Sequence, residues 1–197
     1  MDTYVYEVKN NVYINLTNKC TNRCSFCIRT NCKLAYSYDL WLEKEPTYSE
    51  VIEELKKFKN YSEAVFCGYG EPTIKLNEII EISKYLKSIK KPVRLNTNGQ
   101  GNLINGFNIV PKLKGLIDSI SISLNAASEK DYQKLCNSEY KNAYSEVLKF
   151  CMLCAENFDT TLTVLDFLEN VEIQKCKKIA DDLGAKFRVR VFEKNNE

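Results

Sequence analysis

Six short apolar segments, separated by stretches of helical period, restrict the fold of this chain more than any other feature. The segments are Val12 to Leu16, Ala64 to Cys67, Val93 to Leu95, Ser119 to Leu124, Thr161 to Leu165 and Lys186 to Val191. Strands that alternate with helices pair in parallel, because each crossover helix returns the chain to the same end of the sheet. The sequence therefore predicts an α/β fold with six βα units.

Several predicted strands alternate polar and apolar residues, although a parallel strand covered on both faces is normally apolar throughout. The polar positions are Ser119, Ser121, Ser123 and Asn125 in the fourth strand, Thr161 and Thr163 in the fifth, and Arg188 and Arg190 in the sixth. If helices cover the apolar faces, the polar faces line the inside of a partial (βα)6 barrel of parallel strands. A mixed sheet with one face in water is the alternative that this pattern leaves open.

Local signals place two helices and one loop between these strands. Thr47-x-x-Glu50 is typical of a capping box and opens a helix that runs to about Lys59. A second helix follows Asn77, with apolar residues at helical spacing. The Asn-rich stretch 96–108 is predicted to be a long functional loop.

Length and charge limit the class of protein. With 197 residues, 44% of them apolar, we expect residues 1–197 to form a single domain. A net charge of +2 gives no general attraction to nucleic acid or membrane. The start, MDTYVYEVKN, lacks a basic segment followed by an apolar run, and no 18 uncharged apolar residues occur in succession. We expect a cytoplasmic protein without membrane association.

With nine cysteines and no histidine, the chain is expected to bind any metal mainly through cysteine sulfur. Cys20, Cys24 and Cys27 follow the first predicted strand in a segment whose Asn and Thr residues favour a loop. Three thiolates in one loop suit a 4Fe-4S cluster, because they anchor three irons and leave the fourth with an open coordination position. With Phe26 before the third cysteine, the pattern resembles the C-x-x-x-C-x-aromatic-C signature of the radical SAM superfamily.

That resemblance implies two cofactors, the 4Fe-4S cluster and S-adenosylmethionine (SAM). The amine and carboxylate of SAM would chelate the open iron, and Phe26 would pack near the adenine. The alternative is a structural zinc site in which Cys32 is the fourth thiolate, which would make the chain a zinc-stapled binding module without catalysis. We favour the cluster, because structural zinc sites usually pair two C-x-x-C knuckles and because the remaining motifs fit SAM.

Gly68-Tyr69-Gly70-Glu71-Pro72 follows the second predicted strand. Its glycines allow unusual backbone dihedrals and close approach to a ligand. The segment resembles the GGEP motif of the superfamily, with Tyr69 in place of the first glycine, and the resemblance implies that it receives the methionyl amine. An ordinary strand-to-helix turn is the alternative reading.

Further SAM contacts are expected at the carboxyl ends of the third and fourth predicted strands, where parallel sheets bind ligands. The candidates are Asn96, Asn98, Ser121, Ser123 and Asn125. Arg188 or Arg190 would pair with a carboxylate or phosphate, on SAM or on the substrate, unless both are solvated surface residues.

The remaining cysteines are predicted to be structural. Cys151 and Cys154 lie on one apolar helix face, and Cys176 has a similar position on another helix, so these thiols should pack as small hydrophobes. Cys67 and Cys136 have no identifiable ligand partners in the sequence.

Longer phrases of the chain, such as DLWLEKEPT, FCGYGEPT and LNTNGQGNLINGFNIVP, are similar to the radical SAM proteins encoded alongside TatD-type nucleases. The resemblance implies reductive cleavage of SAM to a 5'-deoxyadenosyl radical, with a flavodoxin or ferredoxin as electron donor. The substrate is unknown. Because six βα units leave little chain to close a partial barrel, we expect a wide opening, unless residues 30–46 fill it. Such an opening suits a macromolecule, or a partner protein that the chain would activate as glycyl-radical activases do.

Overall fold

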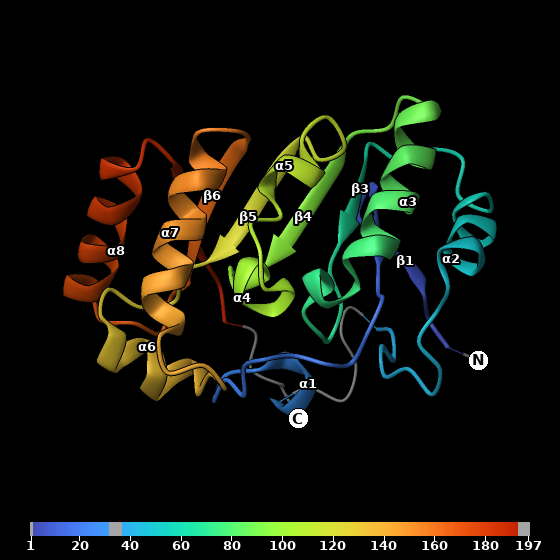
Figure 1. The fold of residues 1–197 in the computed structure, drawn as a ribbon. Helices are drawn as coiled ribbons and strands as arrows, with labels where there is room; N and C mark the ends of the chain where they lie inside the picture. The colour runs from blue at the N-terminus through green and yellow to red at the C-terminus, as the bar shows by residue number, and fades with distance from the viewer. Residues whose placement is uncertain (1, 32–36, 193–197) are drawn as a thin grey trace.

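The computed structural model describes residues 2–31 and 37–192, which form a seven-stranded sheet with helices packed against one face (Figure 1). The strands are β1 (Val5–Val8), β2 (Asn11–Ile14), β3 (Glu63–Phe66), β4 (Val93–Thr97), β5 (Ser119–Ser123), β6 (Asp159–Leu165) and β7 (Lys186–Arg190). The helices are α1 (Ile28–Asn31), α2 (Tyr48–Leu55), the 3-10 helix η1 (Pro72–Lys75), α3 (Leu76–Ser88), α4 (Gly101–Asn105), α5 (Val110–Leu113), α6 (Glu129–Cys136), α7 (Ala143–Ala155) and α8 (Asn170–Asp182).

The strands lie side by side in the order of the sequence. Each strand from β2 to β6 pairs in parallel with the next, which confirms the six predicted strands and the α/β fold. The strand β1 was missed; it pairs antiparallel with β2 and makes the sheet mixed at that edge. A two-residue turn joins β1 to β2, and its first residue, Lys9, has a φ of 58°, where glycine or asparagine would have signalled a hairpin.

The alternation of polar and apolar residues divides the sheet into two unlike faces. The apolar positions face the helices and form the main core, in which Ile14, Phe66, Leu95, Ile122 and Leu162 are fully buried. Burial of these side chains fixes the register, because a slip of one residue would turn every apolar side chain to the other face. The polar positions therefore share the opposite face, which we call the inner face.

A second, smaller apolar cluster lies on the inner face at the β1–β2 edge. Tyr6 and Tyr13 of the hairpin stack there at 5.4 Å between ring centroids, and Leu40 and Tyr69 pack against them. Tyr38 joins the same cluster. Part of the segment 30–46 therefore covers this end of the inner face, while the β7 edge holds exposed residues.

The local predictions need three corrections. The capping box at Thr47 and Glu50 is present, but α2 ends at Leu55 instead of about Lys59. Helix α3 begins at Leu76, directly after η1. The predicted loop 96–108 contains α4, because Asn105 Nδ2 donates to Gly101 O at 2.8 Å within that turn and Gly106, with a φ of 72°, ends it.

Cys151, Cys154 and Cys176 are fully buried on α7 and α8, which confirms that these thiols pack as small hydrophobes. None of the helices described between residues 2 and 192 is long and apolar enough to cross a membrane.

Candidate cofactor site

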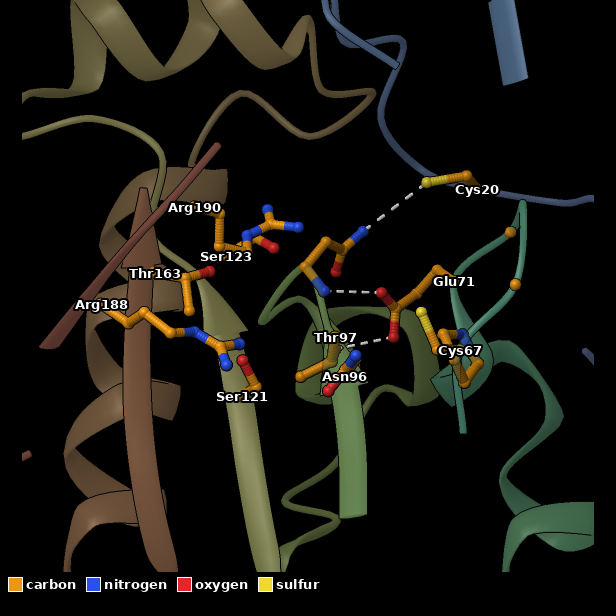
Figure 2. Close-up of a pocket in the computed structure, with 14 residues that line it drawn as sticks. Cys20, Cys67, Glu71, Asn96, Thr97, Ser121, Ser123, Thr163, Arg188 and Arg190 are labelled. Carbon is orange, nitrogen blue, oxygen red and sulfur yellow. Dashed lines mark hydrogen bonds between the residues drawn. The ribbon is translucent and has the colours of Figure 1, made fainter. Parts of the chain in front are cut away.

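A cavity of about 180 Å³ lies on the inner face at the carboxyl ends of the central strands, and Figure 2 shows its lining. Every strand from β3 to β7 contributes to it, directly or through the loop that follows, and Cys20 borders it from the cysteine loop. The lining residues are Cys20, Cys67, Gly68, Gly70, Glu71, Pro72, Asn96, Thr97, Asn98, Ser121, Ser123, Thr163, Arg188 and Arg190. Most side chains predicted to contact SAM thus surround one space.

The cysteine loop, residues 20–27, is attached to the end of α6 by main-chain contacts. Asn22 and Ser138 form an isolated antiparallel bridge. The neighbouring hydrogen bonds are Arg23 N to Cys136 O at 2.9 Å, Ser25 N to Leu135 O at 3.0 Å and Glu139 N to Thr21 O at 2.9 Å. The loop is therefore held by backbone pairing over several residues, so its cysteines have defined positions.

A buried polar network under the loop centres on Gln100, which is completely buried. Its Nε2 donates to Asn22 Oδ1 at 2.8 Å and to Tyr132 Oη at 2.9 Å. Its Oε1 accepts from Ser138 Oγ at 3.3 Å. Since each of these groups is almost inaccessible to water, the network couples the end of β4 to both the loop and α6.

The Glu71 carboxylate joins the turn after β3 to the end of β4. Its Oε1 accepts from Thr73 Oγ1 and from Thr97 Oγ1, both at 2.7 Å, and its Oε2 accepts from Asn98 N at 2.7 Å. Burial raises the pKa of this carboxyl, whereas the hydrogen bonds lower it. Both oxygens already have protein donors, so the first role of Glu71 is to fix the shape of the cavity.

The glycines of this turn provide space for the protein's own chain. A Cβ on Gly70 would lie 2.3 Å from Thr17 O and 2.4 Å from Lys19 O, and a Cβ on Gly68 would lie 2.0 Å from Asn15 Oδ1. Neither glycine has a positive φ, so the expectation of unusual dihedrals is wrong here. Their small size lets the turn pack against the strand that leads into the cysteine loop.

All three cysteines of the loop are partly exposed. Burial raises the pKa of the Cys20 thiol to about 12 and also raises that of Cys27. A hydrogen bond with Cys136, followed by burial, raises the pKa of Cys24. Asn98 Nδ2 approaches Cys20 Sγ at 3.9 Å, as an amide donor to a thiolate ligand would.

The loop therefore offers three thiols on a rigid backbone beside a polar cavity, which fits a cluster with one open iron. Within the described residues, no three Cys, Asp or Glu side chains gather closely enough to hold one metal ion. A cube does not need such a grouping, because each cysteine binds a different iron. Cys32, the fourth ligand of the zinc alternative, lies outside the described residues.

Three of the predicted SAM-site residues do not line the cavity. Phe26 packs against Phe167, with ring centroids 5.5 Å apart. Tyr69 belongs to the apolar cluster on the inner face. Asn125, at a φ of 61°, donates from Nδ2 to Cys136 Sγ at 3.4 Å.

Three lining residues were not among the predicted SAM contacts, and the sequence analysis also missed one neighbour of the cysteine loop. Thr97 and Thr163 line the cavity, and the alternation in β6 was the signal for Thr163. Cys67 also lines it, although it was assigned as structural. Cys136 is buried against Cys24 and Asn125, a contact that only the packing of α6 on the loop creates.

Residues 14–183 match the family model of the Radical SAM superfamily, and the chain belongs to this superfamily. Membership implies a 4Fe-4S cluster and SAM as cofactors. The chain is 25% identical over 166 residues to a probable dual-specificity RNA methyltransferase RlmN from Endomicrobium trichonymphae, an alignment that covers 79% of this chain and 44% of the relative. It is 27% identical over 136 residues to a putative glycyl-radical enzyme activating enzyme from Methanocaldococcus jannaschii, covering 67% of this chain and 55% of that protein.

Solved structures share the fold. SuiB of Streptococcus suis, bound to precursor peptide SuiA, matches with a TM-score of 0.71 at 16% identity, covering 96% of this chain and 40% of that one. TYW1 with a lysine-pyruvate adduct matches with a TM-score of 0.67 at 15% identity, covering 93% of this chain and 65% of that one. This shared fold confirms the prediction of a partial barrel. The chain spans about half the length of the two curated relatives.

Proposed function

We propose that the chain binds a 4Fe-4S cluster at Cys20, Cys24 and Cys27 and SAM in the adjacent cavity, and that it cleaves SAM reductively. When bound, the reduced cluster supplies the electron that splits SAM and yields a 5'-deoxyadenosyl radical for hydrogen abstraction. The observation that carries this proposal is the position of Cys20, which borders the same cavity as Glu71, Asn98 and Ser123.

Several of the predicted contacts have a physical role in or beside the cavity. The amine of SAM meets main-chain carbonyls near Gly68 and Gly70, because the oxygens of Glu71 are occupied by protein donors. Ser121 and Ser123 offer hydroxyl groups to the polar half of the cofactor. Phe26, with Phe167 against it, offers an aromatic surface to the adenine.

The substrate in this proposal is a macromolecule or a partner protein. The smaller apolar cluster of Tyr6, Tyr13 and Leu40 covers the inner face at the β1–β2 edge. At the opposite edge Arg188 of β7 is exposed, so the cavity is accessible from the β7 edge. Two similar proteins have names that state such substrates, an RNA methyltransferase and SuiB with its precursor peptide. Abstraction of hydrogen from a partner polypeptide is a second candidate, favoured by the similarity to a glycyl-radical enzyme activating enzyme.

The proposal also includes the electron donor, the cellular location and the subgroup of the superfamily. A flavodoxin or ferredoxin supplies the electron, because SAM cleavage calls for a cluster towards the low end of the potentials open to iron-sulfur centres. We place the protein in the cytoplasm, as one radical SAM core unit. The phrases shared with the proteins encoded beside TatD-type nucleases suggest the same subgroup, which is part of this hypothesis.

The test is anaerobic reconstitution with iron and sulfide, followed by dithionite and SAM, with 5'-deoxyadenosine measured by mass spectrometry. The wild type should contain about four irons per chain and form 5'-deoxyadenosine, because three thiolates anchor the cluster. Cys24→Ala should lose both, whereas Cys176→Ala, which removes a buried thiol of α8, should retain both.

One zinc per chain without sulfide would refute the cluster. A fully assembled cluster that neither binds SAM nor cleaves it would refute the SAM assignment.

A further inference from the structure

The end of α6 lies antiparallel to the cysteine loop, and this pairing sets two thiols opposite each other. Asn22 and Ser138 form the antiparallel bridge, and Arg23 N donates to Cys136 O at 2.9 Å. Two residues from the bridge, Cys24 faces Cys136, and their thiols share a hydrogen bond. Residues that face each other in an antiparallel pair have Cα atoms about 4.5–5.5 Å apart, within the range that a disulfide spans. The two backbones therefore already have the spacing of a disulfide.

The two thiols differ in their access to solvent. Cys136 is completely buried, whereas Cys24 is partly exposed. Asn125 Nδ2 donates to Cys136 Sγ at 3.4 Å, which fixes the position of the buried sulfur. A small oxidant therefore reaches Cys24 first and finds a second thiol beside it. An accessible thiol next to a resolving thiol is the arrangement typical of cysteines that oxidise reversibly.

We propose that Cys24 and Cys136 are a site of reversible oxidation, in which Cys136 closes a disulfide with Cys24 in the chain that holds no cluster. Hydrogen peroxide oxidises the Cys24 thiol to a sulfenic acid and releases one water. The Cys136 sulfur then attacks the Cys24 sulfur, the S–O bond breaks, and the hydroxyl group leaves with the Cys136 proton as a second water. The two thiols thus lose two electrons and two protons, and one peroxide is reduced to two waters.

This role goes beyond the proposed function and belongs to a different state of the chain. Cys24 is a ligand of one iron when the cluster is bound, so its sulfur is free for a disulfide only in the cluster-free chain. A dithiol reverses the disulfide, whereas a sulfenic acid without a partner is oxidised further to a sulfinic acid that a dithiol does not reverse. Cys136 therefore preserves this ligand until a cluster is assembled.

The test uses cluster-free protein that has been reduced, freed of reductant and exposed to hydrogen peroxide. Free thiols are then alkylated with iodoacetamide, and the protein is digested with trypsin. Cleavage after lysine and arginine leaves Cys24 in peptide 24–29 and Cys136 in peptide 135–141. In the wild type, mass spectrometry should find these two peptides joined by a disulfide, and fragmentation should assign it to Cys24 and not to Cys27. Dithiothreitol should separate the peptides.

Cys136→Ser removes the resolving thiol and keeps an acceptor for Asn125. After peroxide, this variant should carry a sulfinic acid at Cys24. Its iron content after dithiothreitol and reconstitution should fall to about half or less of its own value without peroxide, whereas the wild type should recover its full value. Comparing each protein with its own unoxidised sample removes any effect of the substitution on folding.

Cys176→Ser is the matched control, because it makes the same change at another completely buried thiol, on α8. This variant should form the disulfide between Cys24 and Cys136 and recover iron as the wild type does.

The proposal is overturned if the wild type forms no disulfide between Cys24 and Cys136, or if Cys24 pairs mainly with Cys20 or Cys27. It is also overturned if Cys136→Ser recovers as much iron as the wild type, or if Cys176→Ser loses as much as Cys136→Ser. The peptide map needs no cluster. A chain that takes up no iron before oxidation would therefore contradict the proposed function, while the map would still decide whether the two thiols pair.

Discussion

Gln100 Nε2 donates to Asn22 Oδ1 at 2.8 Å, and this buried contact joins the end of β4 to the middle of the cysteine loop. Asn22 lies between Cys20 and Cys24, so the position of Gln100 is transmitted to both thiols. The same amide group donates to Tyr132 on α6, and the main-chain carbonyls of Leu135 and Cys136 at the end of this helix accept hydrogen bonds from the loop. The loop is thus held from two sides by contacts within the protein.

Gln100→Leu should impair both stability and cluster assembly. The substitution leaves Asn22 Oδ1 without its donor in a site with little access to water, which costs about 1–3 kcal/mol of the free energy of unfolding. Urea unfolding of the metal-free protein measures the first effect, and iron content after reconstitution measures the second. Gln174→Leu, a change of the same type at an exposed position on α8, should leave iron content unchanged; equal iron loss in both variants would contradict the role of the network.

Gly70→Ala should displace the start of the cysteine loop. The added Cβ would lie 2.3 Å from Thr17 O and 2.4 Å from Lys19 O, and backbone atoms cannot move aside as a flexible side chain can. We expect iron content after reconstitution to fall severalfold, together with a lower urea midpoint.

Gly184→Ala provides the comparison for this variant. Gly184 has a φ of 67° and no atom within 4 Å of the added Cβ, so alanine there strains only the backbone, at about 1 kcal/mol. A normal iron content in Gly184→Ala and a reduced one in Gly70→Ala would show that the close approach matters, and normal iron in both would show that it does not.

Asn98→Ala should make the cluster harder to reduce. Asn98 Nδ2 lies 3.9 Å from Cys20 Sγ and donates to Thr21 Oγ1 at 3.1 Å, so it directs a positive dipole at a cluster ligand. Donors near the sulfurs stabilise the more negative, reduced cluster, and their removal lowers its reduction potential. A redox titration followed by electron paramagnetic resonance without SAM measures this shift, with Asn157→Ala at the end of α7 as control. An unchanged or higher potential would count against the contact.

Glu50 should contribute stability that depends on pH. A hydrogen bond from Lys44, followed by bonds from the Thr47 backbone and side chain, lowers the pKa of this carboxyl from 4.5 to about 2. A carboxyl whose pKa is lower in the folded state stabilises the fold above pH 4.5, and this contribution is lost as the pH falls towards 2. The difference in urea midpoint between the wild type and Glu50→Gln should therefore be constant from pH 7 to 5 and shrink below 4.5.

Glu53→Gln, on the same helix, reports the cost of removing an exposed charge there. A difference in urea midpoint between the wild type and Glu50→Gln that is as large at pH 3 as at pH 7 would refute the role given to the ionised carboxyl.

Much of the site could be predicted from the alternation of polar and apolar side chains along the strands. Alternation in β5 and β7 placed Ser121, Ser123, Arg188 and Arg190 on one face, and the structure brings them to one cavity. The alternation gave a wrong position for Asn125, because this residue lies beyond the end of β5 and its positive φ turns the side chain towards Cys136. Extended geometry holds only within the strand, so the two-residue period ends with it.

The sequence by itself determined the parallel sheet and the cysteine loop, because both depend on local spacing: a two-residue period decides which side chains share a strand face, and three cysteines in eight residues share a loop whatever surrounds them. Only the tertiary structure decided what holds that loop. Gln100, Tyr132 and Ser138 meet Asn22 across more than 70 residues of chain, and Gly70 is needed because Thr17 and Lys19 pass next to it. Such contacts arise from the packing of α6 and β4 around the loop, which no local pattern encodes.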